Sequence, residues 1–163
     1  MKKPRNNSLP KHQAPDWHTY FMNIAKVVKT RGNCMIYHVG AVLVQGRQII
    51  ATGYNGTPRG TPNCLEGGCK RCADKVGGLI KSGEDKDMCI CVHAEVNAIL
   101  QSAYQGTSTK GASMYTTTSP CMLCAKEMLN AGVQAVYYDK EDPGEQASLN
   151  FLKKFMKEIR QIV

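Results

Sequence analysis

The residues best suited to chemistry are one histidine, one glutamate and two cysteines, which occur in two short motifs. The stretch HAE places His93 two residues before Glu95, and the stretch PCMLC places Cys121 and Cys124 three residues apart. Cysteines at positions i and i+3 are neighbours on a helix, so both sulfurs can reach one metal ion. A helix N-terminus also favours the thiolate, which is the form that binds zinc. The two motifs therefore predict a zinc site.

His93 and Glu95 are expected to have different roles, because residues two apart do not share a helix face. Ligation by His93, Cys121 and Cys124 would leave the fourth tetrahedral position of zinc open, as in catalytic sites. Zinc lowers the pKa of a bound water toward ~7, and Glu95 can then carry the proton. His-x-Glu followed by Pro-Cys-x-x-Cys is a known signature of zinc nucleobase deaminases. The alternative is that these residues are ordinary core side chains.

The first elements that must position these motifs are a helix and a hairpin. Asp16 can cap a helix in which apolar residues recur at helical spacing, and Gly32 or Asn33 can end it. The aromatic residues Trp17 and Phe21 are assigned to its buried side. The stretch VGAVLVQGRQIIATGYN predicts two strands joined by a short turn.

The second half of the chain alternates helices and strands. We expect a helix from about His93 to Tyr104, a strand at ASMYTTT, a helix over 121–131, a strand at QAVYY and a helix from about Glu145, with Phe151 and Phe155 in its core. The closing RQIV reads either as a fifth strand or as the end of the last helix. This alternation predicts an α/β layered sheet.

Length and composition indicate one compact domain over residues 16–163, since the chain has 163 residues of which 42% are apolar. Residues 1–15 are polar, hold three prolines and are expected to form a disordered tail. No apolar run approaches the ~18 to 20 residues of a membrane-spanning helix, and no signal peptide is recognisable. The expected compartment is cytosolic or nuclear, with the cytoplasm as the prediction.

The net charge of +8 has three interpretations. The stretch KKPR and the basic C-terminal helix hold much of the excess, and these side chains can simply be solvated. A nucleic-acid partner would also suit a basic protein, as would a small anionic substrate.

Residues 55–90 are rich in glycine, cysteine and charge and show no clear period. An unstructured loop of that length is improbable in a compact domain unless something holds it. Intracellular thiols are kept reduced, so the eight cysteines of the chain favour metal binding or chemistry over disulfides.

The motifs HAEVNAIL, SPCMLCAKEMLNAGV and VGAVLV, and above all ATGYNGTPRG, resemble the deoxycytidylate (dCMP) deaminase family over roughly residues 17–140. The first two belong to the whole cytidine and deoxycytidylate deaminase superfamily. TGYNGTPRG is closer to deoxycytidylate deaminases than to tRNA adenosine deaminases or free cytidine deaminases. The resemblance implies a three-layer α/β/α sandwich with a central mixed sheet of about five strands, and a homo-oligomer, commonly a hexamer.

The same resemblance implies a hydrolase that converts dCMP to dUMP and ammonia for thymidylate synthesis, without an organic cofactor. Its zinc ligands would be His93, Cys121 and Cys124, and Glu95 would be the acid/base. Asn55 would lie near the deoxyribose and Arg59 near the phosphate, which suits an amide that donates and accepts and a guanidinium fork. The alternative for Asn55 is a plain Asn-Gly turn.

A subgroup of the family carries a second, structural zinc, and the remaining cysteines resemble that subgroup. Four of six would be enough: Cys34, Cys64, Cys69, Cys72, Cys89 and Cys91. Such a site would hold the long loop, because metal binding stabilises what a small core cannot. The alternative is reduced cysteines in a flexible loop.

The resemblance also implies activation by dCTP and inhibition by dTTP. Many relatives have basic residues just before VGAV and an arginine near the end of the HAE helix. This chain has Ile36, Tyr37 and His38 at the first place and Tyr104 at the second. Allosteric control is therefore an expectation that these departures put in question.

Three other functions compete. One is a deaminase that accepts dCTP as well as dCMP. Another acts on bases in tRNA or single-stranded nucleic acid, although the few aromatic residues, assigned to helix cores, argue against a stacking groove, so no nucleic-acid partner is expected. The last is a non-enzymatic zinc module, which predicts closed four-ligand sites and no role for Glu95.

Overall fold

The computed structural model describes residues 13–81 and 83–162. Most of the predicted tail, residues 1–12, lies outside the described residues, so the tail and the domain boundary at residue 16 stay predictions. Within the described part, no helix is both long and apolar enough to cross a membrane.

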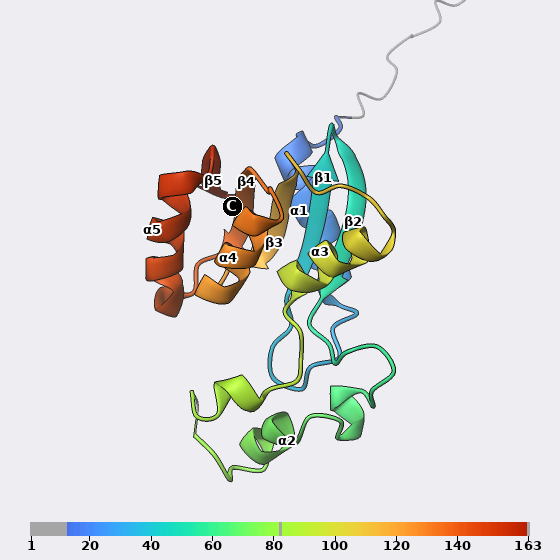
Figure 1. Cartoon of the computed structure of the whole chain (residues 1–163), viewed down its shortest axis with the longest axis vertical. Coiled ribbons are helices and arrows are strands. Elements are labelled where there is room, and N and C mark those ends of the chain that lie inside the picture. Colours follow the sequence, from blue (N-terminus) through green and yellow to red (C-terminus); the bar gives the residue numbers. More distant parts are fainter. Residues whose placement is uncertain (1–12, 82, 163) are drawn as a thin grey trace, which may run out of the picture.

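A five-stranded mixed sheet forms the centre of the molecule (Figure 1). The strands are β1 (Gly40–Gln45), β2 (Gln48–Tyr54), β3 (Ser113–Thr118), β4 (Ala135–Lys140) and β5 (Glu158–Gln161), in the spatial order β2-β1-β3-β4-β5. β1 runs antiparallel to β2 and β3, while β3, β4 and β5 are mutually parallel. The closing segment is therefore a strand and not the end of the last helix.

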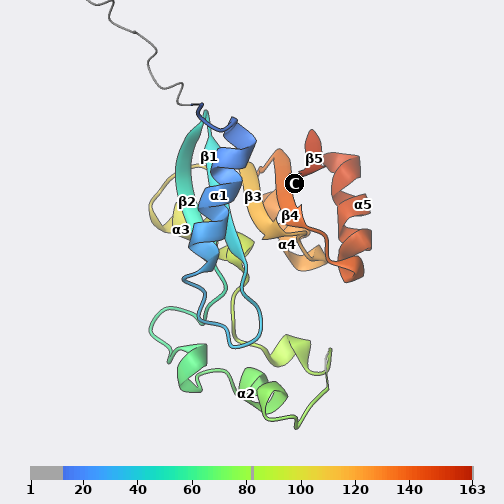
Figure 2. The same ribbon diagram turned by 180° about the vertical axis from the view of Figure 1, so that it is seen from behind.

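Helices cover both faces of the sheet. They are α1 (Trp17–Lys29), α3 (Ala94–Tyr104), α4 (Met122–Asn130) and α5 (Gln146–Phe155). Figure 2 shows α1 in front of the sheet, whereas α3 and α4 lie on the opposite face, with α5 beside α4 (Figures 1 and 2). These three layers confirm the predicted α/β/α sandwich.

Alternation along the strands builds the two cores. Val42 and Tyr115 point to α1 and share a core cluster with Phe21, whereas Leu43 and Met114 belong to the cluster on the other face. Successive side chains of a strand face opposite sides, so each helical layer receives every second residue.

Small residues hold α3 close to β2. A Cβ on Gly53 would lie 2.1 Å from the carbonyl oxygen of Ala94 and 2.4 Å from the amide nitrogen of Ala98. Only glycine permits this approach, and Ala94 and Ala98 on the helix side are fully buried. The contact places the start of α3 against the sheet.

The start of α1 is where the sequence indicated. Oδ1 of Asp16 accepts hydrogen bonds from the amides of His18 at 2.9 Å and Thr19 at 3.1 Å. Phe21 is buried, but Trp17 is 47% exposed, and Phe155 of α5 is 64% exposed. The assignment of Trp17 and Phe155 to helix cores was wrong, because each ring packs on the neighbour four residues away at the edge of its helix and stays largely accessible to solvent.

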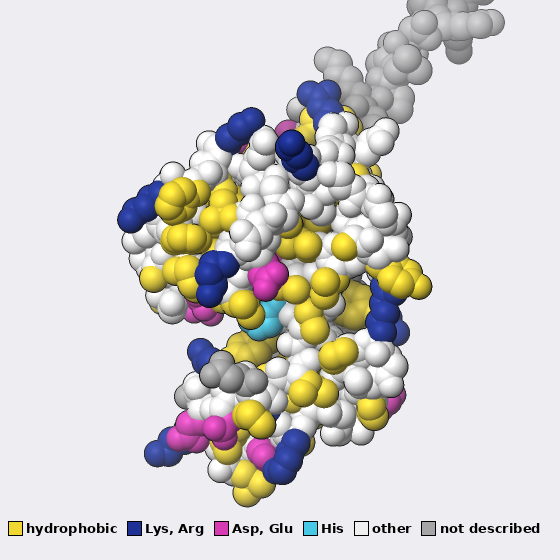
Figure 3. Space-filling view, in the orientation of Figure 1, with side chains coloured by type: hydrophobic (Ala, Val, Ile, Leu, Met, Phe, Trp, Pro, Cys, Tyr) yellow, Lys and Arg dark blue, Asp and Glu magenta, His cyan; other side chains and the backbone are white. Residues whose placement is uncertain are grey.

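The long loop contains short helices and forms a separate part of the molecule, the cysteine lobe (residues 57–91; Figures 1 and 2). It includes α2 (Lys70–Val76) and two single 3-10 turns, Cys64–Glu66 and Lys86–Met88. Figure 3 shows a hollow between this lobe and the part that contains the sheet. The lobe is joined to the sheet by the segments that end β2 and begin α3.

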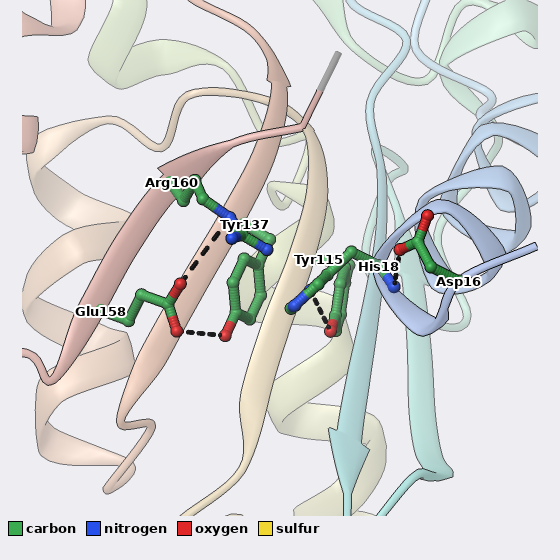
Figure 4. Close-up of polar contacts among 6 residues, drawn as sticks. All are labelled: Asp16, His18, Tyr115, Tyr137, Glu158 and Arg160. Atoms are coloured by element: carbon green, nitrogen blue, oxygen red, sulfur yellow. Dashed lines mark hydrogen bonds and ion pairs between the residues drawn. The ribbon is translucent and has the colours of Figure 1, made fainter.

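A polar network crosses the α1 side of the sheet (Figure 4). Nδ1 of His18 lies 3.0 Å from the hydroxyl of Tyr115, and the hydroxyl of Tyr137 donates to Glu158 at 2.7 Å. The rings of Tyr115 and Tyr137 stack with centroids 4.7 Å apart. Buried phenols need such partners, so the network satisfies both tyrosines and joins α1 to β3, β4 and β5.

Candidate active site

Three metal donors converge where two helices begin. Nδ1 of His93 lies 3.4 Å from Sγ of Cys121 and 3.4 Å from Sγ of Cys124. In a tetrahedral site, Zn–S bonds of about 2.3 Å and Zn–N bonds of about 2.0 Å place nitrogen and sulfur about 3.5 Å apart. Both the spacing and the nitrogen and sulfur donors therefore fit zinc.

The start of each helix positions its ligand. His93 is the N-cap of α3 and Cys121 is the N-cap of α4, while Cys124 lies in the first turn of α4. The sequence placed the first helical residue at His93 and Cys121, one position too early. Because both helices direct their positive ends at the same point, thiolates are stabilised there.

Glu95 lies beneath these donors. Its side chain is 4% exposed, Oε1 accepts a hydrogen bond of 2.8 Å from the hydroxyl of Thr116, and Oε2 accepts one of 3.6 Å from Sγ of Cys124. Burial raises the pKa of the Glu95 carboxyl. A buried carboxyl with a raised pKa, directly beside metal donors, has the properties of a proton carrier.

Electrostatics favour a thiolate at Cys121. The hydrogen bond from the thiol of Cys124, together with the neighbouring His93, lowers the pKa of Cys121 to about 4. The hydrogen bond between His93 and Cys121 raises the pKa of the His93 imidazole. Metal binding acts in the same direction on thiols, since a coordinating thiol is deprotonated outright.

One side of the donor set is open. His93 is exposed and Cys121 is half-buried, whereas Cys124 and Glu95 are buried. Among the side chains described for residues 13–81, 83–86 and 88–162, no fourth histidine, cysteine or acidic group joins the three ligands within 4.8 Å. Three ligands with one open side are typical of a catalytic zinc site.

Asn55 lies close to the His93 segment. Gly56 and Val92 form an antiparallel bridge, so the GYNG turn runs beside the residue that precedes His93. Asn55 is buried, and its Oδ1 accepts a hydrogen bond of 2.8 Å from the amide of Val39. Oδ1 of Asn55 is thus occupied by a backbone hydrogen bond, and Nδ2 is the atom of this side chain that can bind a ligand.

The structure does not bring Arg59 to the zinc donors. Its guanidinium donates to Oε1 of Gln101 and lies over the ring of Tyr104, 4.5 Å from the centroid. Gln101 is seven residues beyond the start of α3, which is about 10 Å along the helix. Arg59 lines a shallow pocket of about 260 Å³ together with Asn97 and Gln101. Its assignment to a phosphate stays a prediction.

Sequence reasoning missed two residues that position the site. Thr116 holds Glu95, and Asn97 donates from Nδ2 to the carbonyl oxygens of Tyr54 at 2.8 Å and Val92 at 3.3 Å. Thr116 is fully buried in the second position of YTTT, and Asn97 follows His93 by four residues. The signal for Asn97 was a polar residue one turn after His93 on the same helix. The sequence offered no such signal for Thr116, because threonine is common in strands.

The comparisons with known proteins follow this geometry. Residues 15–140 match the family described as the cytidine and deoxycytidylate deaminase zinc-binding region. The chain belongs to this family. That result confirms the family resemblance inferred from the four sequence motifs and supports zinc as the metal.

Individual relatives agree. A deoxycytidylate deaminase of Schizosaccharomyces pombe is 38% identical over 154 residues, which is 94% of this chain and 46% of the relative. One from Mycobacterium phage D29 is 36% identical over 131 residues, covering 78% of this chain and 97% of the relative. The chain thus spans about half the length of the yeast relative, and nearly all of the phage one.

A solved structure shares the fold. The crystal structure of dCMP deaminase from the cyanophage S-TIM5, in complex with dCMP and dUMP, has a TM-score of 0.72 and 30% sequence identity. The match covers 93% of this chain and 100% of that chain. The predicted cytidine deaminase-like fold is confirmed.

Proposed function

We propose that this chain catalyses the hydrolytic deamination of dCMP to dUMP and ammonia, which would supply dUMP for thymidylate synthesis. The observation that carries the proposal is the buried carboxyl of Glu95, held by Thr116 and directed at the donors His93, Cys121 and Cys124. The names of the relatives and the nucleotides in the cyanophage structure support dCMP as the substrate.

Zinc would be held by His93, Cys121 and Cys124, and when bound it supplies a Lewis acid that lowers the pKa of water. Glu95 takes a proton from the attacking water at Oε2 and delivers it to N3 of cytosine as the water oxygen bonds to C4. Glu95 then moves the remaining proton of the C4 hydroxyl to the amino group, the C4–N bond breaks, the C4 carbonyl forms and ammonia leaves. One water is consumed for each dUMP and ammonia formed.

Substrate contacts are proposed for two residues. Asn55 would bind the deoxyribose through Nδ2, because its Oδ1 is already bonded to Val39. Arg59 would bind the phosphate, which requires its guanidinium to leave Gln101. An arginine suits this exchange because its fork pairs with phosphate in a bidentate, charge-assisted way.

Replacing Glu95 by Gln tests the proposal. Glu95→Gln keeps the shape of the side chain and removes its proton-carrying ability, so ammonia release from dCMP is expected to fall almost to zero while zinc content is unchanged. Glu127→Gln on the exposed side of α4 removes the same charge and should keep full activity. Full turnover by Glu95→Gln would refute the assigned role.

A competition assay defines the substrate and the regulation. The wild-type chain would be given dCMP, dCTP, cytidine and a single-stranded oligonucleotide, each with and without dCTP or dTTP as effectors. Preference for dCMP supports the proposal, whereas turnover of dCTP or of the oligonucleotide at a similar rate would favour one of the alternative deaminases. A response to dCTP and dTTP would show that Tyr104 and residues 36–38 are compatible with control.

A further inference from the structure

The six remaining cysteines form one cluster composed of two overlapping sets. One set is Cys34, Cys64, Cys72 and Cys91, and the other is Cys69, Cys72, Cys89 and Cys91. Within each set all four sulfurs lie within 4.8 Å of one another. Cys72 and Cys91 belong to both sets, so the cluster has the form of two tetrahedra that share an edge.

The distances between sulfurs fit metal thiolates. Sulfurs bound to one zinc at about 2.3 Å in tetrahedral geometry lie about 3.8 Å apart, whereas a disulfide joins them at about 2.05 Å. Sγ of Cys72 lies 3.9 Å from Sγ of Cys34 and 3.7 Å from Sγ of Cys89. Cys69 and Cys89 are 3.8 Å apart. Cys72 therefore has ligand spacing to a member of each set.

We propose that the cysteine lobe, together with Cys34, binds two zinc ions in a six-thiolate cluster, bridged by the sulfurs of Cys72 and Cys91. A single ion can use only one set, which would leave either Cys34 with Cys64 or Cys69 with Cys89 as spare thiols. In either case, the sulfurs of the unused pair lie within 4.8 Å of Cys72 and Cys91, as the sulfurs of the used pair do. Two ions account for all six positions, and one ion accounts for four.

Charge supports the same assignment. Six thiolates and two zinc ions leave a net charge of minus two. Arg71, the residue before Cys72, is 4% exposed, and its guanidinium donates to the backbone oxygen of Glu84 at 2.9 and 3.2 Å. A buried guanidinium next in sequence to a cysteine of the cluster is more stable beside an anionic cluster than beside a neutral one.

The cluster also explains how the lobe is held. Its apolar residues Leu65, Val76 and Leu79 are 61%, 65% and 77% exposed, so the lobe has little apolar core of its own. Metal binding supplies the missing stabilisation. Cys34 comes from the connection between α1 and β1, and Cys91 lies two residues before His93. The cluster thus fixes the chain that enters the active site.

Counting zinc in the full-length chain tests the proposal without measuring activity. Native mass spectrometry of the wild type is expected to show three zinc ions per chain, and Cys121→Ser, which removes a ligand of the separate catalytic set, is expected to show two. Two ions in the wild type and one in Cys121→Ser would mean a single ion in the lobe and would overturn the proposal. If only the catalytic ion were missing, the number of zinc ions bound by the six-cysteine cluster would still be two. The count therefore separates failure of this proposal from failure of the proposed function.

A second measurement identifies the bridges. In the wild-type chain substituted with cadmium-113, the β-protons of Cys72 and Cys91 are expected to couple to two cadmium nuclei, and those of the other four cysteines of the cluster to one. Coupling of all six cysteines to at most one nucleus each would contradict the shared edge. This readout uses the intact protein, so it does not depend on whether a cysteine variant folds.

Discussion

The hydroxyl of Thr116 donates a hydrogen bond of 2.8 Å to Oε1 of Glu95, and both side chains are buried. The bond joins the central strand β3 to the first turn of α3. It occupies one carboxylate oxygen and leaves Oε2 directed at Cys124. Proton transfer depends on such orientation, because small displacements of a reacting group lower the rate severalfold to a hundredfold.

Thr116→Val is therefore expected to lower kcat by about tenfold to a hundredfold, since a hydrogen bond to a charged group is worth roughly 1.5–3 kcal/mol. KM and zinc content should change little, because Thr116 orients Glu95 and binds neither substrate nor metal. Thr116→Ser restores the hydroxyl and should recover most of kcat. An unchanged kcat in Thr116→Val would show that Glu95 needs no such support.

Alkaline pH should weaken the α1 side of the sheet. Burial, with a contribution from the charge of Glu158, raises the pKa of Tyr115 to about 12, compared with about 10 in the unfolded chain. The folded state then holds a proton that the unfolded state has lost, so stability is fully present below about pH 10 and falls as pH rises toward about 12.

The measurement is urea unfolding between pH 9 and 12. Tyr115→Phe should be less stable at pH 9, where it lacks the bond to His18, and should lose less stability as pH rises than the wild type does. Tyr20→Phe, on the exposed side of α1, controls for the loss of one phenol. Equal pH slopes in Tyr115→Phe and wild type would contradict the assignment.

Arg59 offers a direct test of phosphate recognition. Arg59→Gln is expected to raise KM for dCMP by about tenfold or more, since a charge-assisted bond to phosphate contributes roughly 1.5–3 kcal/mol. Turnover of deoxycytidine, which lacks the phosphate, should be unaffected.

The matched control is Arg47→Gln, because Arg47 also lies over an aromatic ring, 5.2 Å from the centroid of Trp17. Its KM should equal that of the wild type. If Arg59→Gln also leaves KM for dCMP unchanged, another residue binds the phosphate and Arg59 serves only to cover Tyr104.

The sequence predicted local features well and non-local ones poorly. His93 and Cys121 were recognisable because ligand spacing coincides with helix starts. The hairpin before Asn55 was recognisable because two runs of strand-forming residues are separated by a short turn that contains glycine. Helix α2 was missed, since seven residues without an apolar period give no helical signal.

Thr116 was missed for a different reason. Three threonines in a strand match ordinary β propensity, and only the tertiary position of Glu95 gives one of them a role. The division of the lobe cysteines into two sets was equally out of reach, because Cys34 and Cys72 are 38 residues apart and meet only in the folded chain.

Removal of metal should release the cysteine lobe before the sheet. The lobe has exposed apolar residues and few strand hydrogen bonds, so its local stability depends on the cluster, whereas β1 and β3 are paired on both sides and buried. Titration of the full-length chain with a zinc chelator is expected to raise amide hydrogen exchange first across residues 64–91, with β1 and β3 as protected references.

Activity should fall with the same midpoint, because Cys91 fixes the segment that carries His93. Retained protection of the lobe after its zinc has left would mean that packing, and not metal, holds it.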